Sequence, residues 1–97
     1  MSLVVLAHDR LDAGTTRADT LERHLAWITG SGDHVVRAGP FLSDDGERML
    51  GSLLIVDFAD RAAVEAWAAE DPYVHAGLFE SVTVTAWRQT VGERGSD

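Results

Sequence analysis

The sequence predicts an α+β fold, because apolar strand-like segments alternate along the chain with segments that carry helix-capping signals. The chain has 97 residues, a length that fits one small domain with one core. We therefore expect residues 1–97 to form a single domain, with an ordered core over about residues 3–90 and a disordered polar tail over residues 91–97.

The composition narrows the partners and the chemistry. The formal net charge of −8 disfavours binding to nucleic acids and to anionic membrane surfaces. The chain has no cysteine, so disulfides, thiolate catalysis and cysteine-bound metal centres are excluded. The apolar segment over residues 1–7 is too short to cross a membrane and carries no basic leader, so we expect a cytoplasmic protein.

The first part of the chain predicts a strand and a helix. Leu3–Ala7 is a continuous apolar run, which is typical of a strand buried on both faces. Thr16 and Asp19 have the spacing of a capping box, so we expect a helix to begin there and to continue to Ile28. The glycine-rich segment Gly30–Gly32 then ends the helix.

Two paired strands are predicted next. His34–Ala38 has strand character and is interrupted by Gly39-Pro40, which indicates a bulge or a sheet edge because proline cannot donate to a strand ladder. Met49–Phe58 is a third strand whose centre is apolar throughout. The turn-forming segment Ser43–Gly46 joins the two strands, so we expect a hairpin.

A second helix and a fourth strand complete the pattern. Asp60 is a good N-cap for a helix over residues 61–70, which ends at Asp71 because a proline follows. Residues 72–77 predict one further helical turn, and residues 81–87 alternate hydroxyl and aliphatic side chains as a strand does. The resulting order, β-α-β-β-α-β, is that of the ferredoxin-like fold, a four-stranded antiparallel sheet with both helices on one face.

The first and third predicted strands are apolar on both faces, although the helices of this fold cover one face of the sheet. A second copy of the chain is the simplest cover for the other face. We therefore expect a homodimer in which the two sheets pack together and enclose a barrel-like interior.

His24 is the first candidate site residue, because it lies at helical spacing with three aliphatic side chains. Leu21, Leu25 and Ile28 share its predicted helix face, so a helix that buries this stripe also buries an imidazole. Each ring nitrogen then needs a polar partner. A structural histidine and a general acid or base both fit this pattern, and periodicity alone leaves the choice open.

Asp71 is the second candidate, since an acidic residue at a helix C-terminus is unfavourable for the helix dipole. It can bond local backbone amides, or it can approach His24, because both helices are predicted on the same face of the sheet. An aspartate that accepts from one imidazole nitrogen fixes the tautomer and raises the basicity of the other nitrogen.

Other chemistries lack support in the sequence. No nucleophile-elbow motif is present, so acyl transfer is not indicated. The four histidines lack the spacing of a metal site, and His8-Asp9 at a strand end is a weak candidate at most. We expect neither a metal nor another cofactor.

Several segments, taken in their order and spacing, resemble the YciI-like (YCII-related) family over about residues 3–90. They are His24-Leu25-Ala26-Trp27-Ile28, Arg37-Ala38-Gly39-Pro40, Gly51-Ser52, Glu65-Ala66-Trp67 leading into Asp71-Pro72-Tyr73, and Phe79-Glu80-Ser81-Val82 followed by Val84. The resemblance implies a ferredoxin-like fold that dimerises as an α/β barrel, with His24 and Asp71 as a His–Asp pair in an active site. One similar branch is a dehydrochlorinase that acts on a chlorinated hydroxyhydroquinone without a cofactor, but family membership does not transmit the substrate.

We therefore expect a small cofactor-free enzyme that acts on a small molecule, aromatic molecules included, by elimination or isomerisation. His24 would exchange a proton with the substrate, and Asp71 would orient the imidazole. The candidate ligand-binding residues are Gly39, Pro40, Ser52 and Tyr73. Three alternatives stay open: a non-catalytic binding or sensor module on the same dimeric fold, a cofactor-independent monooxygenase, and a purely structural dimerisation domain.

Overall fold

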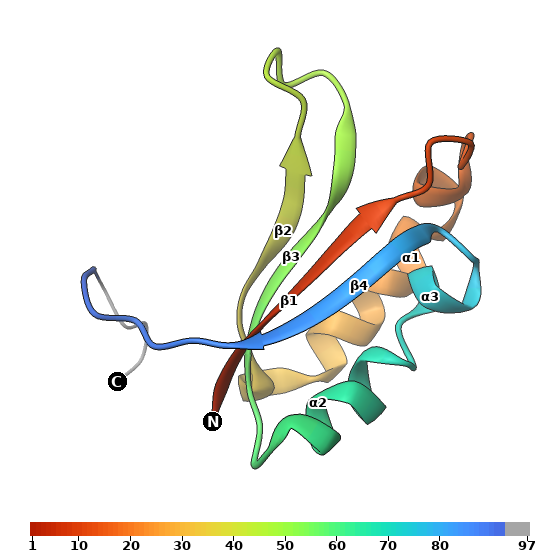
Figure 1. Cartoon of the computed structure of the whole chain (residues 1–97). Coiled ribbons are helices and arrows are strands. Elements are labelled where there is room, and N and C mark those ends of the chain that lie inside the picture. The colour runs from red at the N-terminus through yellow and green to blue at the C-terminus, as the bar shows by residue number, and fades with distance from the viewer. Residues whose placement is uncertain (93–97) are drawn as a thin grey trace.

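Helices pack against one face of a four-stranded sheet (Figure 1). This computed structural model describes residues 1–92, so most of the tail predicted over residues 91–97 lies outside the described residues. In chain order, the elements are β1 (Ser2–Asp9), α1 (Thr16–Gly30), the 3-10 turn η1 (Gly32–His34), β2 (Val35–Leu42), β3 (Met49–Asp57), α2 (Arg61–Ala68), α3 (Pro72–His75) and β4 (Phe79–Ala86). None of the helices in the described range is long and apolar enough to cross a membrane.

The strands lie in the order β2-β3-β1-β4, and each neighbouring pair is antiparallel. This sheet and the element order confirm the predicted ferredoxin-like architecture. The predicted hairpin of β2 and β3 is present and extends beyond the other strands (Figure 1). Gly39-Pro40 does not end β2, which continues to Leu42, because an edge strand has a row of backbone groups that need no ladder partner.

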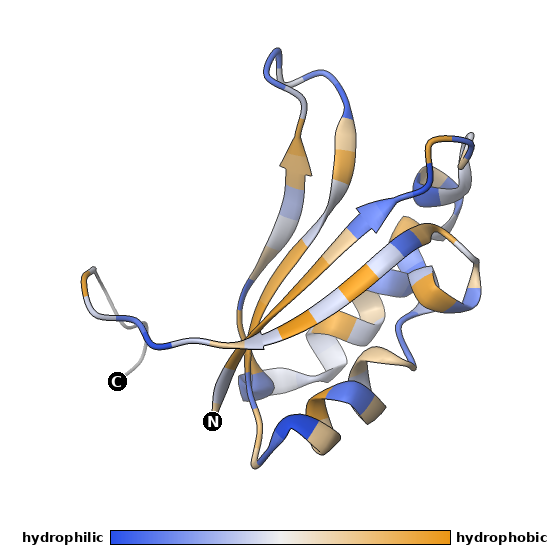
Figure 2. Cartoon of the chain, viewed as in Figure 1, coloured by the Kyte–Doolittle hydropathy of each residue, from blue (hydrophilic) through white to orange (hydrophobic). Residues whose placement is uncertain are grey.

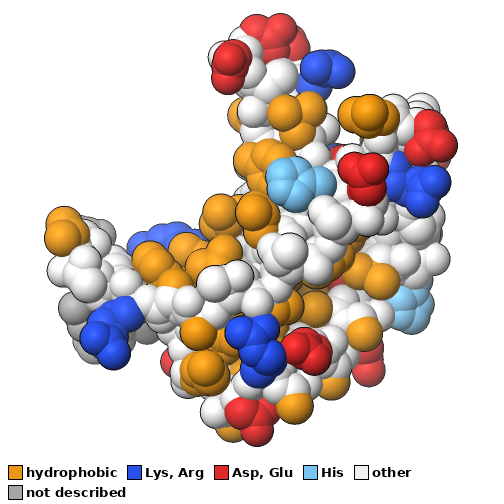
Figure 3. Space-filling view, viewed as in Figure 1, with side chains coloured by type: hydrophobic (Ala, Val, Ile, Leu, Met, Phe, Trp, Pro, Cys, Tyr) orange, Lys and Arg blue, Asp and Glu red, His pale blue; other side chains and the backbone are white. Residues whose placement is uncertain are grey.

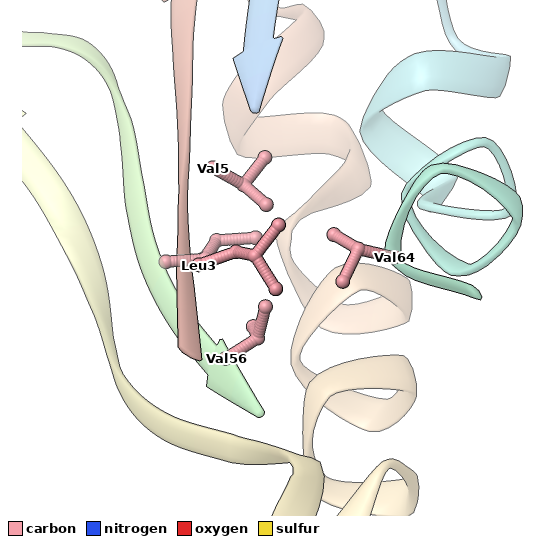
Figure 4. Packing of buried hydrophobic residues seen from close by; sticks show 5 residues of the cluster. Leu3, Val5, Val56 and Val64 are labelled. Carbon is pink, nitrogen blue, oxygen red and sulfur yellow. The ribbon is translucent and has the colours of Figure 1, made fainter. Parts of the chain in front are cut away.

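The hydrophobic core lies between the sheet and the helices. Leu3 pairs with Val56 and Val5 pairs with Leu54 across β1 and β3, so these side chains point to the same face. Figure 4 shows this group directed toward Val64 of α2. Leu3, Val56 and Val64 have no solvent exposure, and burial of each such side chain is worth about 1.5–3 kcal/mol.

The other face of the sheet carries apolar side chains that the described residues leave uncovered. Val4 pairs with Ile55 and Leu6 pairs with Leu53, one position out of phase with the core pairs, so these four side chains lie on the open face. Leu53 is 38% exposed there. Figure 2 shows hydrophobic residues along the central strands, and Figure 3 shows hydrophobic side chains gathered on the surface of the sheet.

The N-cap of helix α1 lies one residue before the position that the sequence predicted. Thr15 occupies the N-cap position, and its hydroxyl donates to the Asp19 carboxylate over 2.9 Å. Thr16 lies inside the helix, where its hydroxyl donates to the Ala13 carbonyl over 2.7 Å. The predicted capping box of Thr16 and Asp19 is therefore wrong. The predicted cap of α2 is confirmed, since the Asp60 carboxylate accepts the Ala63 backbone N–H.

The buried face of α1 also differs from the predicted aliphatic stripe. Thr20 and His24 are the buried residues of this helix, whereas Leu21 and Leu25 are 40% and 52% exposed. One residue turns a helix by about 100°, so the leucines that follow Thr20 and His24 rotate away from the sheet. The burial of His24 is therefore as predicted, but Thr20, and not Leu21 or Leu25, shares its buried face.

Gly51 lies on β3, between its register partners His8 on β1 and Phe41 on β2. A Cβ atom at this position would overlap the Ala7 carbonyl oxygen and the ring of Phe41. Phe41 is the register partner of Gly51 on β2, and its ring also packs edge-on against His8. Glycine is therefore required for the close approach of β1 and the Phe41 ring at this point.

Candidate active site

His24 lies in the middle of α1, on the side that faces α3 and the sheet. The residue is 7% exposed and Asp71 is 3% exposed. The His24 Nδ1 atom and the Asp71 Oδ1 atom are 2.9 Å apart, which is hydrogen-bond distance. The predicted approach of these two residues is therefore present in the fold.

Asp71 has a second role that the sequence interpretation gave only as an alternative. It is the N-cap of α3, and its Oδ1 atom accepts the backbone N–H of Tyr73 over 2.9 Å. Asp71 therefore heads a short helix as well as following α2, so it benefits from the dipole of α3. Since Oδ1 is an acceptor in this cap, the His24 Nδ1 atom carries the hydrogen and donates it to the same oxygen.

This arrangement leaves the second ring nitrogen of His24 free of the contact with Asp71. The Nε2 atom makes no hydrogen bond to any residue in the described range. With Nδ1 donating to Asp71, the neutral imidazole has its lone pair on Nε2 and can accept a proton there. Asp71 would stabilise the imidazolium that forms.

Tyr73 packs directly on the imidazole. The two rings are stacked, with centroids 4.0 Å apart and an angle of 16° between their planes. The Tyr73 residue is fully buried, and its hydroxyl completes no well-formed hydrogen bond among the described residues, although Arg17 lies close to it. Burial raises the pKa of Tyr73, while the nearby positive charge of Arg17 acts in the opposite direction.

Arg17 and Asp9 form an ion pair that the sequence interpretation missed. The Arg17 Nε and Nη2 atoms donate to the two carboxylate oxygens of Asp9 over 2.8 Å and 2.7 Å. Nη2 also donates to the hydroxyl of Ser52 over 3.1 Å, and the guanidinium lies 4.7 Å from the centre of the Tyr73 ring. Helical spacing could have placed Arg17 on the face of His24, which it precedes by two turns, but it does not indicate Asp9 as the partner.

The positive charge of Arg17 is held in place by these contacts. Burial acts to lower the pKa of Arg17, but hydrogen bonding and charge attraction from Asp9, with a smaller contribution from Tyr73, raise it overall. Both side chains are nearly buried, with exposures of 13% for Arg17 and 11% for Asp9. Bidentate pairs of this kind fix the orientation of both partners.

The four residues predicted to bind a ligand fall into two groups. Ser52 and Tyr73 are buried beside Arg17 and His24 and belong to one connected network. Gly39 and Pro40 lie exposed on the edge strand β2. Pro40 is the register partner of Ser52, so it lies beside the network rather than within it.

A cleft of about 940 Å³ opens near this network. Its walls come from the β1–α1 segment, from the turn and first residues that lead into β3, and from the start of β4. Figure 3 shows the molecule hollowed between the β2–β3 hairpin and the part of the chain that joins β1 to α1. Asp9 and Arg17 line the cleft, whereas His24 and Asp71 do not.

Trp27 and Trp67 pack against each other behind His24. Their ring centroids are 4.4 Å apart, and the Trp67 Nε1 atom donates to the Ser31 hydroxyl over 2.8 Å. Trp27 also contacts His24, with ring centroids 5.8 Å apart. The tryptophan pair therefore supports the side of the imidazole from within the protein.

The weak metal candidate at His8-Asp9 takes part in other contacts. Both carboxylate oxygens of Asp9 accept from Arg17, and the His8 ring packs against Phe41. Among residues 1–92, no three His, Asp or Glu side chains are grouped as metal ligands would be.

The fold and the buried pair define a class: a small α+β domain with a histidine held by an aspartate beside a cleft. The YCII-related domain model matches residues 1–88, and the chain belongs to this family. The resemblance found in the sequence is therefore confirmed.

Relatives and a solved structure agree with this assignment. The chain is 32% identical over 96 residues to protein YciI of Escherichia coli O6:H1 and 31% identical over 96 residues to an uncharacterised protein of Haemophilus influenzae, covering 92% of this chain and 98% of each relative. It is similar in structure to 5-chloro-2-hydroxyhydroquinone dehydrochlorinase (TftG) from Burkholderia phenoliruptrix AC1100, solved in complex with 2,5-dihydroxybenzoquinone. That match has a TM-score of 0.84 and 28% identity, and it covers 93% of this chain and 96% of TftG.

Proposed function

We propose that this chain is a small cofactor-free enzyme in which His24 exchanges a proton with a small-molecule substrate. The observation that carries the proposal is the buried hydrogen bond of 2.9 Å between His24 Nδ1 and Asp71 Oδ1. It leaves Nε2 to accept or donate the proton, and it provides a carboxylate to stabilise the imidazolium. The similarity to a dehydrochlorinase supports acid–base chemistry on a small molecule.

The reaction class is elimination or isomerisation. In an elimination, His24 Nε2 takes a proton from the substrate, and the electron pair of the broken bond forms a new double bond. The leaving group departs with its own bonding pair, as chloride does from a chlorinated ring. In an isomerisation, the imidazolium returns the proton to a different atom.

The binding residues are proposed from the same network. Tyr73 and Ser52 lie near His24, and their hydroxyl groups would fix the orientation of the substrate. Gly39 and Pro40 would allow a ligand to approach the backbone of β2 closely. Tyr73 has the strongest support, because its ring stacks on His24 and its hydroxyl completes no well-formed hydrogen bond among residues 1–92. Arg17 lies beside this hydroxyl, and the Tyr73 O–H can still donate to an oxygen atom of a substrate.

The proposal includes a homodimer formed through the open face of the sheet. Leu53, Leu6, Val4 and Ile55 make this face apolar, and the described residues leave it uncovered. A contiguous apolar surface of this kind is typical of an interface between subunits. Sheet-to-sheet packing would give the barrel-like dimer that the sequence predicts.

A non-catalytic binding module is the second candidate. It is favoured by one observation, namely that His24 and Asp71 do not line the cleft in this structure. On this view, the pair holds a polar group of a bound metabolite and no bond is made or broken.

The two candidates separate in a turnover experiment. We expect purified protein to release chloride from 5-chloro-2-hydroxyhydroquinone or from a related chlorinated phenol, and His24→Gln to reduce kcat by at least about 100-fold. His75→Gln is the matched control, because His75 is exposed and bonds only the Ala69 carbonyl in the described chain. Binding of these compounds that survives in His24→Gln, with no product formed by the native protein, would support the binding module.

A further inference from the structure

The cleft and the His24–Asp71 pair are neighbouring parts of one site, and Arg17 and Tyr73 connect them. The Arg17 side chain lines the cleft. Its guanidinium also lies over the Tyr73 ring, and that ring is stacked on His24. A ligand that contacts Arg17 from the cleft is therefore one aromatic ring away from the imidazole.

One part of the cleft wall is apolar, and it accounts for several exposed hydrophobic side chains. Leu11, Leu21, Met49 and Leu50 are each more than a third exposed, and all four line the cleft. Leu21 is the residue that helical periodicity assigned to the core. Its exposure is explained if this position contacts a ligand rather than the sheet.

Beside these apolar residues, Arg17 is the side chain on which the polar contacts of the cleft converge. Asp9 and Ser52 hold the Arg17 guanidinium through Nε and Nη2. The Nη1 atom takes no part in these three bonds, and the Tyr73 hydroxyl also lies close to the guanidinium. Nη1 carries two N–H groups, so a ligand oxygen can accept from one of them even when the other points to Tyr73. Apolar wall residues beside a polar group that is held in place, in a volume of this size, are found in small-molecule sites.

We propose that this cleft is the binding site for a ring-sized molecule, with its apolar body against Leu21 and Met49 and one hydrogen-bond-accepting oxygen on Arg17. Arg17 is then the residue that determines specificity. This inference rests on the proposed function in one respect, because it names the substrate class of the same site.

The charges around the cleft select a ligand that is neutral or carries one negative charge. The charged residues that line it are three arginines and three acids: Arg10, Arg17, Arg48, Asp9, Glu47 and Glu80. Arg17 is already neutralised by Asp9, and the chain has a net charge of −8. A phosphate ester with two negative charges would bring unbalanced charge into a partly desolvated site, so a hydroxyl, carbonyl or carboxylate oxygen fits better.

Binding can be tested without knowledge of the substrate. The probes are resorcinol, benzoate and phenyl phosphate, which present a ring with neutral oxygens, with one negative charge and with two. Titration of the nitrogen-15-labelled protein, followed by amide chemical shifts, should move the amides of Leu11, Arg17, Leu21 and Met49. We expect phenyl phosphate to bind at least about tenfold more weakly than resorcinol, a difference of about 1.4 kcal/mol.

Two pairs of variants locate the site. Leu21→Gln should weaken resorcinol binding about fivefold, and Leu25→Gln should leave it unchanged, since both leucines are exposed on α1 but Leu21 alone lines the cleft. Arg17→Lys keeps the charge but loses the forked geometry, so it should weaken binding by a similar factor. Arg23→Lys, on the exposed side of the same helix, is its control.

Several results would overturn the inference. The first is an absence of chemical-shift changes with every probe, or changes confined to residues outside the cleft. The second is an equal effect of Leu21→Gln and Leu25→Gln on binding. The third is a set of shift changes in the cleft that follow protein concentration without a probe, which would mean that a second copy occupies the cleft. Probe binding in the cleft without His24-dependent turnover contradicts the proposed function alone. Turnover that depends on His24, with normal kcat/KM in Leu21→Gln, contradicts the cleft alone.

Discussion

The Nδ1 atom of His24 lies 2.9 Å from the Oδ1 atom of Asp71, although 47 residues separate them in the sequence. The same oxygen accepts the backbone N–H of Tyr73, the second residue of α3. One carboxylate oxygen therefore holds the first turn of a helix and the imidazole at the same time. Its two roles can be separated by substitution.

Asp71→Asn should preserve the fold and reduce the activity. Asparagine caps a helix as well as aspartate does, so the melting temperature should change little. Its neutral amide cannot stabilise an imidazolium, and kcat should fall by about 10²–10⁴-fold. Thermal unfolding and turnover measured on one preparation test both expectations, with Asp33→Asn at the exposed η1 turn as the control. Unchanged kcat would show that Asp71 is structural.

The ionisation of Tyr73 can be followed directly, because it is the single tyrosine of the chain. Burial raises the pKa of Tyr73 above its usual value of 10.0, and Arg17 opposes this effect. The near-ultraviolet phenolate band should therefore appear at higher pH in the native protein than in urea. Tyr73→Phe should lose the signal entirely. A lower midpoint in the native protein than in urea would contradict the burial of the phenol.

The same shift predicts a loss of stability at alkaline pH. The folded state binds the phenolic proton more tightly than the unfolded state does, so the contribution to stability is complete below the unfolded pKa near 10.0. It is lost as the pH rises from that value through the higher pKa of the folded state. Urea unfolding across this range should show a steeper decline for the native protein than for Tyr73→Phe. Equal slopes would be inconsistent with a raised pKa.

Arg17→Gln should be strongly destabilising, because it leaves the Asp9 carboxylate nearly buried without its cation. Loss of one partner from such a pair costs about 3–5 kcal/mol. Arg10→Gln is the matched control, since Arg10 and Asp12 are exposed and 3.3 Å apart, and pairs of this kind contribute about 0–1 kcal/mol. Urea denaturation compares the two variants. The double variant Asp9→Asn with Arg17→Gln should recover part of the loss.

Leu53→Asp should convert the proposed dimer to a monomer. The substitution places a charge in the middle of the open sheet face, where Leu6 is its register partner. Sedimentation analysis should give the mass of two chains for the native protein and of one chain for the variant. Leu25→Asp, which adds the same charge to an exposed site on α1, should leave the mass unchanged. A monomeric native protein would refute the proposed interface.

The strand pattern was the most predictable part of the fold. Leu3–Ala7 and the centre of β3 are apolar without interruption. These runs are short and contain β-branched residues, which favours a strand over a helix. Asp60 and Pro72 marked the helix starts because capping and backbone geometry depend on local sequence alone. The phase of α1 was less predictable, because its buried positions carry Thr20 and His24 while leucines occupy exposed ones.

The candidate site was predicted in part. The order of the helices was enough to bring Asp71 toward His24, since both helices lie on one face of the sheet. The partnership of Arg17 with Asp9 was not predicted, because isolated charges in sequence resemble those of any solvated surface. It depends on how the end of β1 meets the first turn of α1, a tertiary relationship that no local pattern encodes.

The order of Asp71 and His24 along the chain has a consequence for synthesis. A ribosome that adds about 5–20 residues per second makes His24 several seconds before Asp71. During that interval the imidazole has no carboxylate to order it. The nascent chain therefore lacks the His24–Asp71 pair until residue 71 has been added, and any product truncated before that residue lacks it permanently.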